Sequence, residues 1–180
     1  MLIEGDYPKT IIKEGDFIYV NEMVEFIKEN YLDLNIIVAA YSENHPHSNY
    51  ISKDIDFFVN KVNAGADEAV TQYFYNIDAY FSFVDEVQKL GVDIPIIPGI
   101  MPITSYDKLI NFSTNCGAEI PSWILNRLKL YRNDAKSLIE FGEDVVSEMC
   151  LKLKDGGVKN FHFYTMNKVE PVLSIAKRIL

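Results

Sequence analysis

Two of the three histidines in the chain, His45 and His47, flank Pro46 directly after an apolar run and close behind Glu43. Histidines and acids that lie close together can ligate a metal ion, but such a site needs three or four converging ligands. The same residue types also suit a loop that binds a small ligand, or a solvated turn. The local sequence leaves these three alternatives open.

A second group of polar residues lies on segments that are otherwise regular. Asp54 and Lys61 are seven residues apart on a predicted helix, so they share one face of it. This face could be an ordinary solvated surface or part of a binding site. Gln72 interrupts an apolar strand pattern. An amide in such a place needs a hydrogen-bond partner, which a ligand can supply.

The elements that position these residues alternate along the chain. Short apolar runs predict strands at Leu34–Tyr41, Asp67–Tyr75, Asp93–Ile100 and Asn160–Thr165, with a stub at Leu2–Asp6. Amphipathic stretches predict helices at Val20–Tyr31, Ser52–Asn63, Ile77–Leu90, Ser105–Asn115, Asn133–Lys154 and Glu170–Leu180. This alternation predicts βα units and a parallel sheet.

The placement of the polar residues favours a (β/α)8 TIM barrel over an open doubly wound sheet. An open sheet usually carries a glycine-rich phosphate loop after an early strand, and the sequence has none. Polar residues instead follow the strand ends, as at the mouth of a barrel. A complete barrel has eight strands in roughly 200–250 residues. We therefore predict one α/β domain over residues 1–180 that forms an incomplete TIM barrel.

Composition excludes several classes of protein. The 180 residues are 48% hydrophobic and carry a formal net charge of −9 without a basic block, which argues against nucleic acid and anionic membranes as partners. Cys116 and Cys150 are far apart, as expected for reduced thiols. The sequence shows neither a signal-peptide pattern nor a membrane-length apolar run. These features predict a cytoplasmic protein.

Six segments of the chain resemble the methylenetetrahydrofolate reductase family, flavoproteins built on a (β/α)8 barrel. They are EGD at Glu4–Asp6, VAAYSENHP at Val38–Pro46, KVNAGADEAVTQYFYN at Lys61–Asn76, IPIIPGIMPIT at Ile94–Thr104, IPSW at Ile120–Trp123 and GVKNFHFYTMN at Gly157–Asn167. Their order and spacing hold along the whole chain. Together the six segments are highly specific for this family, although no single segment would be.

The resemblance implies a flavin-dependent hydride transfer. NADH or NADPH would reduce FAD, and the flavin would reduce a methylenetetrahydrofolate substrate. By position, the family's catalytic aspartate is Asp6. The implied FAD contacts are Gly5, Asp6, Tyr41, His45, Asp54 and Lys61, and the implied folate contacts are Asp6, Gln72, Phe112 and Lys168. No metal site is implied, and His47 matches no functional position.

The sequence also departs from the family pattern. Phe57 and Asn60 stand where many relatives carry an amide and an arginine, and Lys168 replaces a common arginine. By resemblance the chain corresponds roughly to strands 4 to 8 of the family's barrel, and the family's first strands, with the glutamate regarded as proton donor, have no counterpart here. We therefore expect reductase activity only if a companion chain or a longer polypeptide supplies those strands. A homo-oligomer is the other assembly that we consider. The alternatives are a catalytically inactive remnant and a barrel-fragment interaction module.

Overall fold

The computed structural model describes residues 1–2, 16–31, 33–43 and 51–180, apart from the side chains of residues 51 and 52. The strands are β1 (Ile37–Ala40), β2 (Glu68–Tyr73), β3 (Ile96–Ile100) and β4 (His162–Phe163). The helices are α1 (Val20–Asn30), α2 (Ile51–Asn63), α3 (Ile77–Lys89), α4 (Tyr106–Cys116), α5 (Ser122–Leu130), α6 (Ala135–Asp155) and α7 (Glu170–Ile179).

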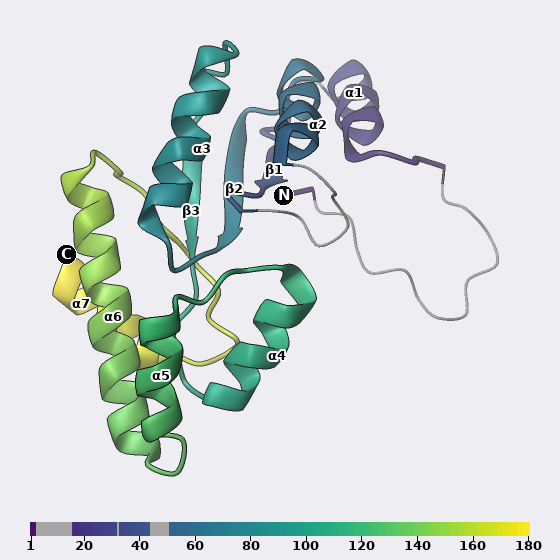
Figure 1. The fold of residues 1–180 in the computed structure, drawn as a ribbon. Coiled ribbons are helices and arrows are strands. Elements are labelled where there is room, and N and C mark those ends of the chain that lie inside the picture. Colours follow the sequence, from purple (N-terminus) through teal and green to yellow (C-terminus); the bar gives the residue numbers. More distant parts are fainter. Residues whose placement is uncertain (3–15, 32, 44–50) are drawn as a thin grey trace.

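The strands form one parallel sheet in the order β1-β2-β3-β4. Leu2 adds an isolated parallel bridge to Val38 on the outer side of β1. Within the described residues the sheet is a curved segment whose two sides do not meet (Figure 1). The prediction of parallel βα units that form part of a (β/α) barrel is therefore confirmed.

The register between β2 and β3 changes near Thr71. Ala69 and Val70 pair with Ile96 and Ile97, whereas Tyr73 pairs with Gly99. At the irregularity the Gly99 N–H donates to the Thr71 side-chain oxygen (2.9 Å), and the Tyr164 hydroxyl donates to the Thr71 carbonyl (3.0 Å). Side chains thus satisfy main-chain groups that the regular ladder leaves free.

Local capping chemistry explains where several helices begin. The side chains of Asn76, Ser105 and Asp134 accept hydrogen bonds from the first-turn N–H groups of α3, α4 and α6. Gly65 and Gly91, which follow α2 and α3, adopt positive φ angles that favour glycine. The predicted helix boundaries consequently differ from the observed ones by only one or two residues.

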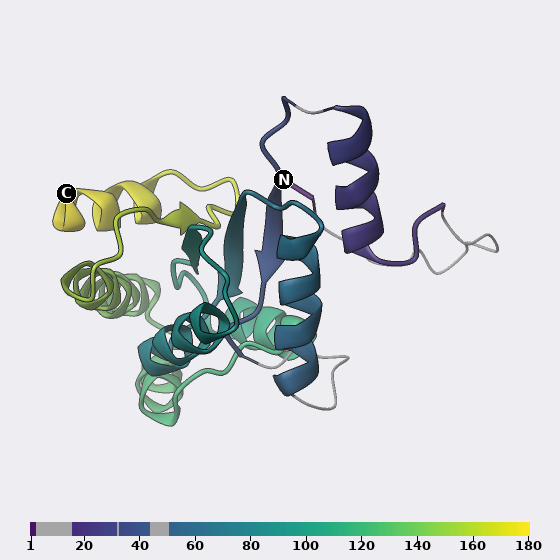
Figure 2. The same cartoon turned by 90° about the horizontal axis from the view of Figure 1, so that it is seen from above.

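The core has two parts. The first lies among β1, β2 and helices α1 to α3, and it contains Val24, Val38, Phe58, Ala69, Phe83 and Val87. The second lies beneath helices α4 to α7, and it contains Phe74, Ile100, Ile103, Leu128, Leu153 and Ile175. Viewed from above, α1 and α2 lie beside β1, while α6 and α7 lie on the β4 side (Figure 2).

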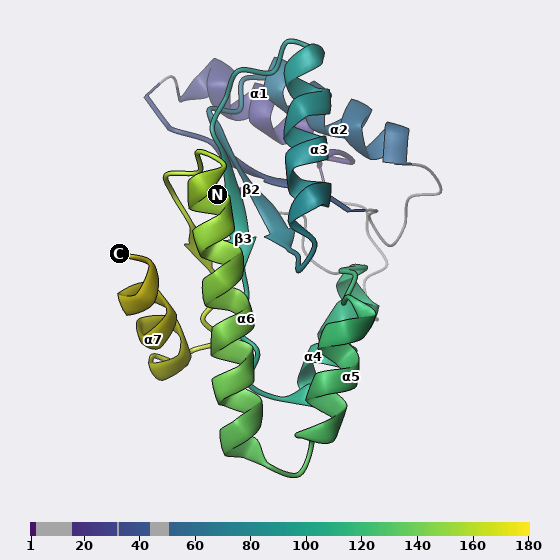
Figure 3. The same ribbon diagram turned by 60° about the vertical axis from the view of Figure 1, so that its left-hand side comes forward.

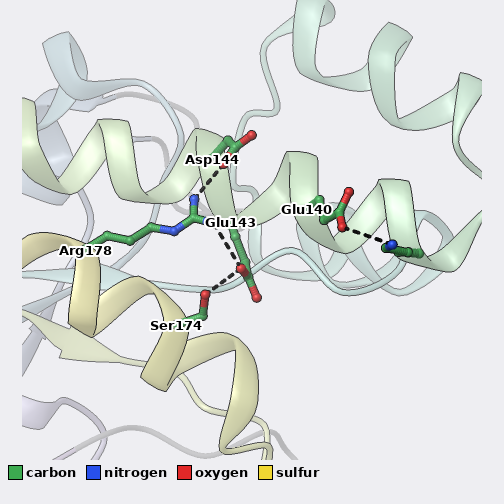
Figure 4. Close-up of polar contacts among 6 residues, drawn as sticks. Glu140, Glu143, Asp144, Ser174 and Arg178 are labelled. Carbon is green, nitrogen blue, oxygen red and sulfur yellow. Dashed lines mark hydrogen bonds and ion pairs between the residues drawn. The ribbon is translucent and has the colours of Figure 1, made fainter.

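Helices α5, α6 and α7 extend the second core. Figure 3 shows α5 and α6 running side by side, joined at one end by a short loop. Polar contacts fix α7 against α6: Ser174 donates to Glu143 (2.6 Å), and Arg178 pairs with Asp144 (2.6 Å) and more distantly with Glu143 (3.5 Å) (Figure 4). Glu143 is largely buried in this cluster, so the pairing determines how the last helix is placed.

None of the described helices combines the length and the apolar character needed to cross a membrane.

Candidate functional site

A pocket opens where β1 and β2 end. Its volume is about 190 Å³, including space open to solvent, and its walls come from three parts of the chain. The lining residues are Tyr41, Ser42 and Glu43 after β1, Gln72 and Tyr73 of β2, Cys116 at the end of α4, and Gly117 and Ala118 directly after it. Carboxyl ends of parallel strands meet at one edge of a sheet, which is where barrel enzymes place their sites.

One wall of the pocket is a small hydrogen-bonded cluster around the Tyr73 hydroxyl. This oxygen lies 3.1 Å from the Ser113 hydroxyl, and the Cys116 thiol donates to it over 3.2 Å. Burial raises the pKa of Tyr73 well above its ordinary value, so the phenol keeps its proton at neutral pH. The cluster ties β2 to α4 and fixes the shape of the wall.

Tyr73→Phe is expected to lower the free energy of unfolding by about 1–2 kcal/mol, because Ser113 is buried and loses this partner. Urea denaturation followed by circular dichroism measures the change. Tyr131→Phe is the matched control, since its hydroxyl makes no hydrogen bond to any described residue and should cost little. Equal effects of the two changes would contradict a structural role for the cluster.

Gln72 lines the pocket, and only the oxygen of its side-chain amide is hydrogen-bonded to the described residues. Its side-chain oxygen accepts a hydrogen bond from the Tyr73 N–H (3.0 Å), which fixes the orientation of the side chain. The amide nitrogen has no partner among the described residues. Because Gln72 is half-buried and lines the pocket, its two N–H donors are available to an acceptor that enters there.

Glu43 supplies an acidic group to the same pocket. One carboxylate oxygen, Oε2, accepts a hydrogen bond from the Glu119 N–H (2.7 Å), and this joins the segment after β1 to the segment after α4. The other oxygen, Oε1, is buried and has no partner among the described residues. Burial raises the pKa of Glu43 to about 7, and the Glu119 N–H opposes that rise.

The sequence indicated Glu43 only as an acid near His45 and His47, and the family resemblance did not assign it to the flavin or folate contacts. An acid two residues after a predicted strand is usually solvated. The contact that buries it joins residues 76 apart in the chain, so no local pattern contains it.

The structure brings Tyr41 and Gln72 together in the pocket, and the four other predicted residues that it describes do not line this pocket. Asp54 and Lys61 lie half-buried on α2, and the Lys61 ammonium donates to the Ala39 carbonyl of β1. Phe112 is 38% exposed on α4. Lys168 is exposed in the turn between β4 and α7.

Three predicted site residues, Gly5, Asp6 and His45, lie outside the described residues, as does His47. Within the described part of the chain, no group of three or more histidine, cysteine, aspartate or glutamate side chains could hold a metal ion. The two cysteines are not paired with each other: Cys116 lies at the pocket and Cys150 is buried in α6.

Comparison with known proteins gives consistent matches over the whole chain. A family model described as methylenetetrahydrofolate reductase matches residues 1–180. The 5,10-methylenetetrahydrofolate reductase of Buchnera aphidicola (from Acyrthosiphon pisum) is 38% identical over 173 residues, 96% of this chain and 56% of that protein. The enzyme of the same name from Escherichia coli K12 is 35% identical over 93% of this chain and 56% of its own length. The chain thus spans about half the length of these relatives.

A solved structure supports the fold independently. It is an uncharacterized protein from Clostridium thermocellum, described as binding two copies of 5-methyl-5,6,7,8-tetrahydrofolic acid. It superposes with a TM-score of 0.64 at 20% identity, covering 88% of this chain and 57% of the other. At that identity the likeness establishes a shared fold.

Proposed function

Because the chain belongs to the methylenetetrahydrofolate reductase family, we propose that it forms the folate-binding and flavin-binding part of that oxidoreductase. The reaction would be the reduction of 5,10-methylenetetrahydrofolate to 5-methyltetrahydrofolate in one-carbon metabolism and methionine biosynthesis. NADH or NADPH would supply the hydride, FAD would relay it, and the cytoplasm would be the compartment. Because the chain spans only about half the length of these relatives, we propose the complete activity for the assembled barrel.

The observation that carries the proposal is the pocket at the ends of β1 and β2. Gln72, the proposed folate contact, and Tyr41, a proposed flavin contact, line it together, although they are 31 residues apart in sequence. A flavin and a folate must lie against each other for hydride transfer, so their binding residues must converge. The folate bound by the Clostridium thermocellum protein agrees with such a ligand on this fold.

The remaining roles are assigned by position in the family. Asp6 would be the catalytic carboxylate near both flavin and folate, where its charge favours a cationic folate intermediate. The proposed flavin contacts are Gly5, Asp6, Tyr41, His45, Asp54 and Lys61, and the proposed folate contacts are Asp6, Gln72, Phe112 and Lys168. We propose that the chain assembles with a companion chain that supplies the remaining strands of the barrel, or with a second copy of itself as a homo-oligomer.

The described residues fit FAD only in part. The half-buried Tyr41 beside the pocket can pack against a ring and offer its hydroxyl, and Asp54 lies in the first turn of α2. The Lys61 ammonium lies against the β1 main chain and 5.8 Å from the centre of the Phe58 ring. A contact between Lys61 and a phosphate would therefore require this ammonium to leave the Ala39 carbonyl.

Titration of the purified chain with FAD tests the cofactor assignment. We expect a bound-flavin absorption spectrum near equal stoichiometry, and Lys61→Met should weaken FAD binding about tenfold because a charged phosphate contact is lost. Lys53→Met makes the same chemical change at an exposed position of α2 and is the control. Free-flavin spectra at all FAD concentrations would favour the inactive remnant or the interaction module, unless a companion chain restores binding.

A further inference from the structure

One oxygen of Glu43 is buried without a hydrogen-bond partner among the described residues, and the roles assigned above give it no function. The other oxygen of this carboxylate, Oε2, accepts a hydrogen bond from the Glu119 N–H at 2.7 Å. This bond fixes the orientation of the carboxyl group, so Oε1 cannot rotate toward another donor. A buried carboxylate oxygen without a hydrogen bond is costly, and such groups in proteins usually contact a ligand or an ordered water. The oxygen is covered in this conformation, so a ligand in the pocket that Glu43 lines would reach it only after the side chains around it move.

Gln72 and Glu43 offer complementary groups to this pocket. Gln72 has amide N–H donors left over, because its oxygen is used by the Tyr73 N–H. Glu43 has one acceptor oxygen left over. A donor and an acceptor that line the same pocket can together match the edge of a ring that carries a carbonyl next to an N–H, as a cyclic amide does.

We propose that Glu43 determines ligand specificity in this pocket: its free carboxylate oxygen accepts a hydrogen bond from a ring N–H, while Gln72 donates to the adjacent carbonyl. This inference rests on the proposed function, because the pterin ring of a folate has such an edge. Glu43 would then discriminate against rings that present only acceptors at that edge, because such rings would leave its carboxylate without a hydrogen bond.

The contact makes binding dependent on pH. Only the ionised carboxyl accepts at both oxygens, so affinity should rise with pH up to the Glu43 pKa of about 7 and then level off. The other titratable groups around Glu43 are Tyr41, Tyr73, Cys116 and Glu119. No lysine or arginine of the described chain lines the pocket, so no cation there offsets the acid.

Glu43→Gln tests the proposal. The amide oxygen of the glutamine can still accept from the Glu119 N–H, so the link between the two segments is kept, but an N–H₂ group now faces the ligand donor. Calorimetric titration of the 180-residue chain with 5-methyltetrahydrofolate, between about pH 5.5 and pH 8, measures the affinity. For the unmodified chain we expect a rise of about tenfold or more over this range. For the variant we expect weak binding, with only the pH dependence of the ligand itself.

Glu119→Gln is the matched control, because it removes an exposed charge near the pocket and leaves the Glu119 N–H in place. It should keep the rise in affinity and move its midpoint to slightly lower pH, since the Glu119 charge helps to raise the Glu43 pKa. If the unmodified chain binds the folate and Glu43→Gln binds it with the same affinity and pH profile, a water satisfies the free oxygen and the proposal is wrong. Absence of folate binding at every pH would overturn the proposed function together with it.

A second measurement does not depend on the folate. The folded-state pKa of Glu43 lies above its ordinary value of 4.5, so the folded chain holds this proton more tightly than the unfolded chain. Relative to Glu43→Gln, the unmodified chain should therefore lose stability as pH rises from about 4.5 to 7, and no further above that. Parallel stability profiles would show that the carboxyl is not buried as described and would overturn the proposal.

Discussion

Gly99→Ala is expected to destabilise the fold by about 3 kcal/mol or more. A Cβ at this position would lie 2.2 Å from the Thr71 carbonyl oxygen and 2.7 Å from Cε2 of Tyr164. The carbonyl belongs to β2 and accepts the Tyr164 hydroxyl, so it cannot move away without opening the β2–β3 pairing and breaking that bond. Urea denaturation, followed by far-ultraviolet circular dichroism, measures the loss.

Gly91→Ala is the control for this experiment. Gly91 has a φ of +87°, which disfavours alanine, but nothing lies within 4 Å of the position of its Cβ. It should therefore cost about 1 kcal/mol from backbone conformation alone. Replacing Tyr164 by a smaller residue together with Gly99→Ala should not restore stability, because the clash with Thr71 remains. A loss below that of Gly91→Ala would mean that β2 and β3 separate more easily than their pairing indicates.

The clash at Gly99 also explains what local patterns could not predict. The glycine lies in a segment that the family resemblance includes, but the reason for it is a register change between two strands and a ring from residue 164. Side-chain periodicity predicts that a strand exists and which face is apolar. It contains no information on where two strands approach too closely for a side chain.

Helices with a continuous apolar face were predictable, whereas α5 was missed. Only Ile124 and Leu128 of α5 are buried, and the helix begins after Pro121 without a side-chain cap. Trp123 and Leu130 are largely exposed, so apolar residues of α5 lie on its exposed side as well as on its buried side. Helix α5 therefore lacks a clear helical period of apolar residues in its sequence. Its partner is α6, and that contact is not visible in a nine-residue window.

The last strand was predicted in the right place but too long. The run at residues 160–165 is apolar and aromatic, yet only His162 and Phe163 pair with β3, opposite Gly99 and Ile100. The next residue, Tyr164, still donates its N–H to the Ile100 carbonyl, but then the chain enters a turn with positive φ at Met166 and Asn167. Strand length depends on the neighbouring strands, which an isolated segment does not specify.

The candidate site was predictable only through family resemblance. Position in the family indicated Tyr41 and Gln72, and the structure brings both to one pocket. The residues that complete the pocket, Glu43 and the Tyr73–Ser113–Cys116 cluster, depend on contacts across 40 or more residues. Such contacts arise from the topology of the sheet and the position of α4, so a single sequence does not reveal them.

Gln72→Glu is expected to weaken binding of 5-methyltetrahydrofolate by at least about tenfold at pH 8, with little effect on stability. The glutamate keeps an oxygen that can accept from the Tyr73 N–H, so the local structure is retained and only the donor end of the amide is lost. A second carboxylate then lines the pocket beside Glu43, where burial already disfavours ionisation. Like charges raise the pKa of both groups, and neither can donate to a ring carbonyl while ionised.

The control and the pH dependence distinguish this effect from a general change in charge. Gln88→Glu makes the same substitution on the exposed face of α3, away from the pocket, and should leave folate affinity unchanged. At about pH 5.5 the glutamate at position 72 is partly protonated and can donate again, but Glu43 is protonated as well and no longer accepts at both oxygens. The two changes oppose each other, so the affinity of the variant should rise less between pH 5.5 and pH 8 than that of the unmodified chain. Unchanged affinity at both pH values would remove Gln72 from the ligand contacts and leave it as a residue that only stabilises the end of β2.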